Sequence, residues 1–150
     1  PAQDLIRKSS FTTVGDIINR RGDLNTLQEA LKNLQTALDE QLAKADAAHA
    51  AMKQPDDLKA VYDQAYAKSV TTPATAFKST FPALDAMFSS VNKLADFVEA
   101  NKSKVKISGM MLEVNDPKLH QQLNQLLNDV NAKGRDLNAA QTKMLKDIRG

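Results

Sequence analysis

The feature that most constrains the fold is a long stripe of apolar residues in the first third of the chain. Its members recur mostly in alternating steps of three and four: Leu24, Leu27, Leu31, Leu34, Leu38, Ala45 and Met52. That spacing places them on one side of an α-helix. Asp23 precedes the stripe as an N-cap and Pro55 ends it, so we expect one helix of about 30 residues and roughly 45 Å. Such a helix buries its apolar side only against partners of similar length.

Two later segments have the same periodicity and predict two more long helices. One starts at Phe81 and fades at Asn101. The other starts at Asp116-Pro117, with Asp116 as the cap and Pro117 in the first turn, and continues to Ile148. Three long amphipathic segments in one chain favour a bundle in which they pack against one another.

Shorter helices are expected between the first and second stripes. A helix over about residues 56–69 is followed by a break, where Thr72 caps a new turn that has Pro73 near its start. Pro82 interrupts the next pattern, so we expect a kink or a fresh start near Thr80.

Residues 104–114 change from a helical period to strict alternation on both sides of Ser108-Gly109, which predicts a β-hairpin. The fold class is therefore all-α or mainly α: an elongated antiparallel bundle of three long helices plus short helices, with one small hairpin. We expect a single domain over residues 1–150, in which residues 1–22 form an N-terminal segment with a short or broken helix.

Composition excludes several kinds of chemistry. The chain has no Cys, which removes thiolate catalysis, Cys-ligated zinc, iron–sulfur clusters and disulfides. No window approaches the ~18 apolar residues of a membrane span. Lys and Arg number 20 against 18 Asp and Glu, a net charge of +2, which gives no reason to expect nucleic acid as a partner.

Motifs for catalysis, cofactors or metals are missing from the sequence. The two histidines, His49 and His120, are in neither an HExxH nor a Glu-x-x-His pattern, and we interpret both as surface or half-buried helix residues. The five glycines are scattered, so no phosphate-binding loop or nucleophile elbow is present. The sequence predicts no enzyme activity, no cofactor and no metal site.

The hairpin region contains the residues that we single out as an interaction surface: Lys102, Lys104, Lys106, Met110 and Met111. In an extended segment, residues spaced by two point to one side, so the three lysines would form a positive ridge for phospholipid headgroups, polyanionic glycans or an acidic partner. A charged edge that blocks strand pairing is an equally good interpretation. The methionines offer an adaptable contact surface or fold down onto the helix ends.

Three segments suggest a family: the Ala-rich run 45–54 that leads into Asp57-Leu58-Lys59, the restart at 70–74, and Val105-Lys106-Ile107 before the last helix. Over about residues 24–148 the chain resembles an uncharacterised family of small enterobacterial envelope lipoproteins. The resemblance implies a signal peptide with a lipobox Cys upstream of Pro1, and a lipid-anchored domain at the periplasmic face of the cell envelope. It supplies no catalytic residue and no ligand. Composition by itself leaves a cytoplasmic location open.

Two functions follow as hypotheses. The first is a non-enzymatic envelope module that has an interaction or structural role. Its partner would be an envelope or host protein or an envelope polymer, its membrane contact would run through the upstream lipid anchor, and nucleic acid is not expected. The alternative is a small-molecule or lipid carrier, with Met, Phe and Leu lining a cavity between the helices. Assembly into a homo-oligomer is compatible with both.

Overall fold

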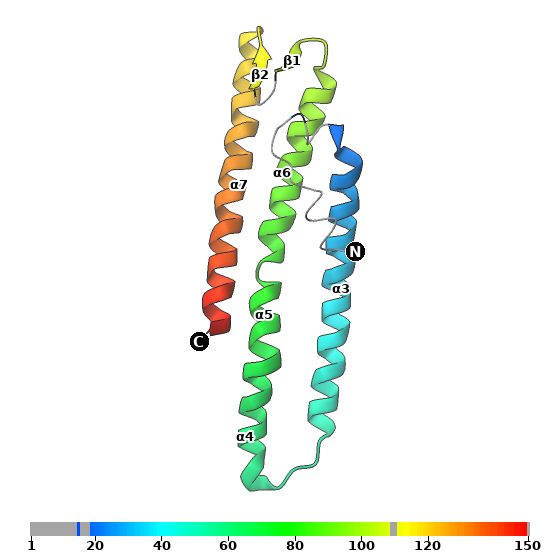
Figure 1. Ribbon diagram of the computed structural model, residues 1–150, viewed down its shortest axis with the longest axis vertical. Helices are drawn as coiled ribbons and strands as arrows, with labels where there is room; N and C mark the ends of the chain where they lie inside the picture. The colour runs from blue at the N-terminus through cyan, green and yellow to red at the C-terminus, as the bar shows by residue number, and fades with distance from the viewer. Residues whose placement is uncertain (1–14, 16–18, 109–110, 150) are drawn as a thin grey trace. The chain divides into compact units, whose positions relative to one another are not determined.

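The computed structural model describes residues 15, 19–108 and 111–149 of the chain. The short or broken helix expected within residues 1–22 falls almost wholly outside these ranges. The elements in chain order are α3 (Arg21–Ala51), α4 (Asp56–Tyr66), the π-helical turn η1 (Ala67–Thr71), α5 (Thr72–Lys78), α6 (Phe81–Ala100), β1 (Val105–Ser108), β2 (Met111–Val114) and α7 (Pro117–Arg149) (Figure 1). The mainly α class, with three long helices and one antiparallel hairpin, is confirmed. No helix in the described ranges contains an apolar stretch that would reach across a bilayer.

The start of the first long helix differs from the prediction. Helix α3 begins at Arg21, so Asp23 lies in its first turn and is not the N-cap. The backbone N–H of Leu24 already bonds to the carbonyl of Arg20 at 3.2 Å. The Asp23 carboxylate instead pairs with the Arg20 guanidinium at 2.7 Å. Its negative charge still complements the positive end of the helix dipole, which explains why the sequence places an acid there.

The break predicted at Thr72 is also wrong. Thr71 has helical dihedrals and makes no side-chain cap, and the chain continues from α4 through η1 into α5. Pro73 has no N–H to donate, and the wider π-helical turn directly before it lets the helical path continue past that missing donor. The fresh start near Thr80 is confirmed, because α5 ends at Lys78 and α6 begins at Phe81.

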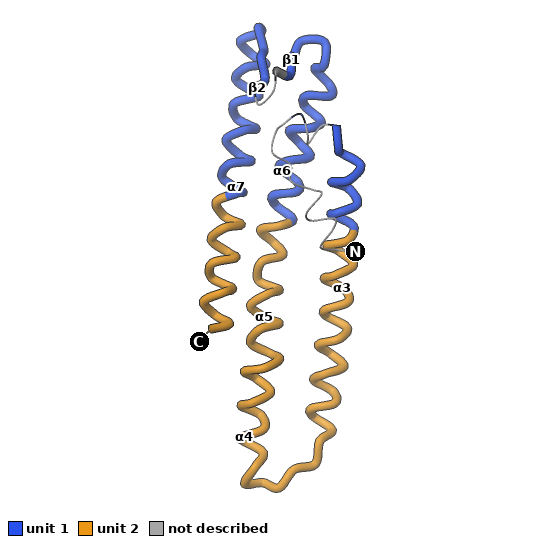
Figure 2. The backbone as a smooth tube through the Cα atoms, in the orientation of Figure 1, with its two compact units in different colours: residues 1–29, 85–134 blue, residues 30–84, 135–150 orange. Residues whose placement is uncertain are grey.

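The backbone groups into two compact units (Figure 2). Unit 1 comprises residues 1–29 and 85–134, and unit 2 comprises residues 30–84 and 135–150. The prediction of a single domain stays a prediction.

Unit 1 has an apolar core. Leu94 and Val98 of α6, Val105 of β1 and Leu123 of α7 are buried together. Partly buried apolar side chains pack around them: Phe97, Leu112, Val114, Leu126, Leu127 and Val130. This cluster ties both strands to two helices and so fixes the position of the hairpin.

Polar contacts add to this core. The Arg21 guanidinium of α3 pairs with Asp96 of α6. Ser90 Oγ of α6 donates to Asp129 Oδ2 of α7 at 2.6 Å. Asp116 caps α7 as predicted, because its Oδ1 accepts the N–H of Lys118 at 2.9 Å and that of Leu119 at 3.2 Å.

Unit 2 buries much less. Among its described residues only Ala76, Thr80 and Phe81 are buried. The Phe77 ring contacts the Phe81 ring edge-on with centroids 5.3 Å apart. An ion pair between Lys78 of α5 and Asp39 of α3 joins two helices of this unit. Most of the remaining apolar seam in unit 2 is half-buried or exposed.

Candidate functional site

The lysines singled out from the sequence lie at the hairpin end of unit 1. All three are exposed, but only Lys106 is in a strand. Lys102 and Lys104 lie in the turn over residues 101–104. There the N–H groups of Lys104 and Val105 both bond to the carbonyl of Asn101, at 2.8 and 3.0 Å, which curls the backbone. The extended ridge assumed for the three lysines is therefore wrong, since spacing by two gives one side only in extended backbone.

A pocket of about 430 Å³ nevertheless brings two of these lysines together. Its lining residues are Ser103, Lys104, Lys106, Glu113, Asn115 and Asp116. Lys106 is paired across the hairpin with Glu113, so the pocket carries both signs of charge. The Asp116 carboxylate is already engaged by the start of α7. The pocket thus offers two ammonium groups and one exposed carboxylate, a pattern that suits a partner with acidic groups and hydrogen-bonding capacity.

The two methionines of the predicted surface have different outcomes. Met110 lies outside the described residues. Met111 begins β2, with its Cα opposite Ser108 in the register, and its side chain is not described. Their predicted role in binding stays a prediction. Ile107, on the facing strand, adds an exposed apolar side chain to this end of the hairpin.

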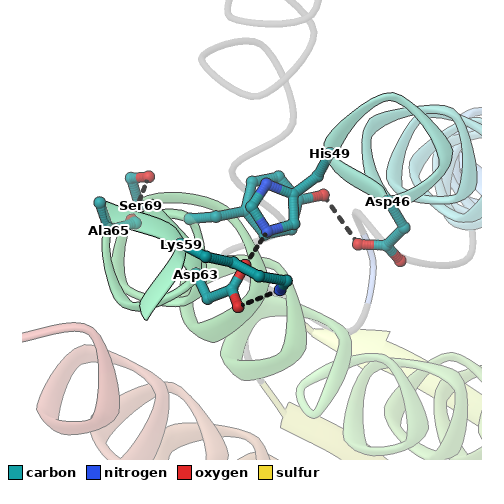
Figure 3. A network of polar contacts seen from close by, with 7 residues as sticks. Asp46, His49, Lys59, Asp63, Ala65 and Ser69 are labelled. Atoms are coloured by element: carbon teal, nitrogen blue, oxygen red, sulfur yellow. Dashed lines mark hydrogen bonds and ion pairs between the residues drawn. The ribbon is translucent and has the colours of Figure 1, made fainter. Parts of the chain in front are cut away.

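Unit 2 holds a polar network that sequence reasoning missed (Figure 3). His49 Nε2 of α3 lies 2.9 Å from Asp63 Oδ1 of α4. Lys59 Nζ donates to the other carboxylate oxygen of Asp63 at 2.6 Å. The Tyr66 hydroxyl of α4 donates to Asp46 Oδ1 of α3 at 2.7 Å. The imidazole of His49 and the ring of Tyr66 are stacked, with centroids 4.1 Å apart and planes 5° from parallel.

Two groups in this network have shifted acidities. The hydrogen bond from Lys59 lowers the pKa of Asp63, and the contact with His49 adds to this, against an opposing effect of desolvation. Desolvation, followed by the hydrogen bond to the Asp46 carboxylate, raises the pKa of Tyr66 to about 12. Both shifts preserve the network over the neutral range, because Asp63 stays ionised and Tyr66 keeps its proton.

The network ties two helices together, and each of its polar side chains contacts another member. An adjoining pocket, lined in part by His49 and Met52, holds only about 70 Å³, room for about two waters. His49 is half-buried and His120 is exposed, as interpreted from the sequence. The only local signal was the spacing Asp46-x-x-His49 on one helix and Asp63-x-x-Tyr66 on the next, which places each pair on one face without showing that the two faces meet.

A second pocket in unit 2, of about 320 Å³, lies along α5 and the end of α7. Its polar lining consists of Thr71, Thr72, Thr75, Ser79, Lys143 and Asp147. Lys143 donates to Asp147 at 2.6 Å. These hydroxyl and charged groups differ from the Met, Phe and Leu lining that the carrier hypothesis requires. In the ranges that the structure describes, no three His, Asp or Glu side chains gather closely enough to hold a metal ion.

Comparison with known proteins decides the family. The family described as "Protein of unknown function (DUF3053)" matches residues 1–145. The chain belongs to this family. The uncharacterised protein YiaF of Escherichia coli strain K12 is 31% identical to this DUF3053 chain over 127 residues, which are 85% of the chain and 54% of the relative. The YiaF proteins of Escherichia coli O157:H7 and Shigella flexneri match with the same values.

This DUF3053 chain therefore spans about half the length of the curated relatives it matches. No solved structure matches it. The resemblance to an uncharacterised family with enterobacterial members is confirmed at that level.

Proposed function

We propose that this DUF3053 chain is a non-enzymatic interaction module of the bacterial cell envelope, and that the hairpin end of unit 1 is its contact surface. The observation that carries the proposal is the combination of a fixed backbone and exposed charges. Val105 is buried in the core while its neighbours Lys104 and Lys106 are exposed beside a pocket of about 430 Å³. A hairpin anchored in this way presents its lysines with little further ordering, and preorganisation favours binding.

The partner that fits best is an acidic envelope or host protein, or an anionic envelope polymer. Exposed ammonium groups steer acidic partners and set specificity, and the pocket beside them also offers the Glu113 carboxylate as a hydrogen-bond acceptor. The non-enzymatic part of the proposal rests on the His49 network, whose nitrogen, carboxylate and hydroxyl contacts are directed at one another.

The test replaces both lysines with acids. We expect the Lys104→Glu/Lys106→Glu variant to lose at least ~10-fold in capture of envelope proteins or in co-sedimentation with purified cell-wall polymer, since two attractive contacts become repulsive. The matched control is Lys32→Glu/Lys44→Glu, which makes the same charge change at two exposed residues of α3. Unchanged binding of every partner by the hairpin variant, with folding confirmed by circular dichroism, overturns the proposal.

Attachment to the membrane through a lipid belongs to the same proposal and has its own test. The resemblance to envelope lipoproteins supports a diacylglyceryl-modified Cys upstream of Pro1 in the full-length gene product. Growth of its host with a labelled fatty acid should label that product, and it should fractionate with membranes. An unlabelled, freely released product contradicts the anchor without affecting the hairpin surface.

A further inference from the structure

Helix α4 has two different sides. One side carries Lys59, Asp63 and Tyr66, which form the network with α3. The other side carries Leu58, Val61 and Tyr62, which are 44%, 61% and 45% exposed. With Ala65, which is also exposed, they follow the spacing i, i+3, i+4, i+7 and therefore lie on one face of the helix. We call these four residues the α4 face.

Exposed apolar side chains are ordinary when they are scattered, but these are contiguous along a helix of 11 residues. The helix is about 16 Å long, and its apolar side chains occupy most of that length. Contiguous apolar surface with charged residues at its border is typical of a protein–protein contact.

The charges along the α4 face indicate which partner covers it. Asp57 in the first turn of α4 and Lys68 in η1, two residues past the end of α4, are both exposed. They are eleven residues apart, or about three helical turns, so they lie along the same edge of the face. Their midpoint falls between Tyr62 and Asp63, one residue from the centre of the apolar side chains. A copy of this helix turned by a two-fold axis through that midpoint places its Lys68 opposite Asp57, and its Asp57 opposite Lys68.

We propose that the α4 face binds the α4 face of a second copy of this chain as a two-fold symmetric, antiparallel helix pair. Symmetric dimers use the same patch on both subunits, which requires a patch that is complementary to itself. The α4 face meets that requirement with an apolar centre and one opposite charge at each end. This inference concerns unit 2 and is independent of the hairpin function proposed for unit 1.

The size of the face sets the expected strength. Stable complexes bury about 800 Å² on each partner, and one face of a helix about 16 Å long falls below that. The dimer is therefore weak and concentration-dependent, with a dissociation constant on the order of 10 µM. Sedimentation velocity of the full chain from about 1 to 300 µM covers the transition.

Four variants test the pairing. Val61→Asp places a charge at the centre of the face and should weaken association at least ~10-fold. Asp57→Lys and Lys68→Asp each create two like-charge contacts, and each should weaken dimerisation several-fold. The double variant Asp57→Lys/Lys68→Asp restores two opposite-charge contacts, so its dissociation constant should return to the wild-type value. Recovery by the double variant is specific to antiparallel self-pairing, because in a sample of the purified chain only a second copy carries the compensating charge.

The controls separate pairing from folding. Asp56→Lys removes the other acid of the first turn of α4. Like Asp57→Lys, it removes a negative charge that complements the positive end of the helix dipole, but Asp56 lies off the α4 face. It should dimerise as wild type, as should Lys104→Glu/Lys106→Glu at the hairpin. Circular dichroism confirms the helices of each variant.

Several results overturn the inference: a wild-type chain that stays monomeric at 300 µM, a Val61→Asp variant that associates as wild type, or a double variant without recovery. Co-sedimentation of the monomeric wild-type chain, but not Val61→Asp, with vesicles of mixed zwitterionic and anionic phospholipid also overturns it, since the α4 face would then bind lipid.

Discussion

Helix α3 carries one apolar stripe, yet residues of that stripe have different surroundings in the two units. Leu24, in unit 1, is 4% exposed, whereas Leu34, in unit 2, is 47% exposed. The same contrast holds between the units as wholes. Unit 1 packs its apolar residues around Leu94 and Leu123, while unit 2 is joined by polar contacts such as His49 with Asp63.

This contrast shows what hydrophobic periodicity does and does not determine. A repeat of three and four fixes which residues share a helical face, and it does so equally for Leu24 and Leu34. Burial depends on a second element that covers the face. In unit 1, α6, α7 and the hairpin cover one another around Leu94 and Leu123, whereas unit 2 leaves apolar surface exposed on α4.

The largest effect expected from this comparison is on stability. Leu123→Ala in the core of unit 1 removes a side chain that is 2% exposed and should lower the free energy of unfolding by about 2–5 kcal/mol. Leu34→Ala makes the same chemical change at an exposed position and should cost less than about 1 kcal/mol. Urea denaturation followed by circular dichroism measures the free energy of unfolding of both variants. Equal losses in the two variants would contradict the difference in packing between the units.

A smaller effect should be a gain in stability. Gly134 lies inside α7, and a Cβ built there has no neighbouring atom within 4 Å, so Gly134→Ala should stabilise the chain by about 0.5–1 kcal/mol. The same change at Gly22, which is also open but in the first turn of α3, should gain less because helix ends fray. Denaturation midpoints show which of the two variants gains more stability. A loss of stability in Gly134→Ala would contradict the open space around the added Cβ.

Acid should weaken the network of unit 2 specifically. The Lys59 and His49 contacts lower the pKa of Asp63, so its contribution to stability is complete above its ordinary value of 3.8 and is lost as pH falls through the folded-state pKa. Asp63→Asn should therefore flatten the acid limb of a plot of stability against pH. If the variant and the wild-type chain lose stability equally as the pH falls, Asp63 does not contribute to the acid sensitivity of unit 2.

The smallest effect leaves the fold intact and is spectroscopic. The chain has two tyrosines, so Tyr62→Phe isolates the Tyr66 phenol, whose ultraviolet absorbance should titrate near pH 12. Because the pKa of Tyr66 is raised, its contribution to stability is complete below about pH 10 and is lost as pH rises toward 12. Titration at the ordinary phenol value, or unchanged titration after Asp46→Ala, would contradict the hydrogen bond to Asp46.

The parts of the fold that depend on local pattern were predictable. Asp116 followed by Pro117 is a local start signal, and α7 begins there with the predicted cap. The alternation around Ser108 likewise predicted the two strands. The π-helical turn before Pro73 was missed because Thr71-Thr72-Pro73 is equally typical of a capped restart, and only the flanking helices decide between the two.

The candidate sites depended on contacts that spacing does not encode. The predicted lysine ridge is wrong because the Asn101 carbonyl closes a turn across residues for which the alternating pattern predicts extended backbone. The His49–Asp63 contact joins residues fourteen positions apart on two helices, and no local rule specifies which faces of those helices meet. The charges of the α4 face were equally visible in the sequence, but they gain meaning only once α3 is seen to occupy the other side of α4.

Hydrogen–deuterium exchange of the wild-type chain at several concentrations tests the difference between the units most directly. We predict that α6 amides over residues 90–98 exchange slowly at every concentration, because they lie in the core of unit 1. Amides of α4 should exchange fast at about 1 µM and become protected as the concentration rises toward 300 µM. Protection of α4 that equals that of α6 at the lowest concentration, or that does not change with concentration, would contradict an exposed α4 face that pairs with a second copy.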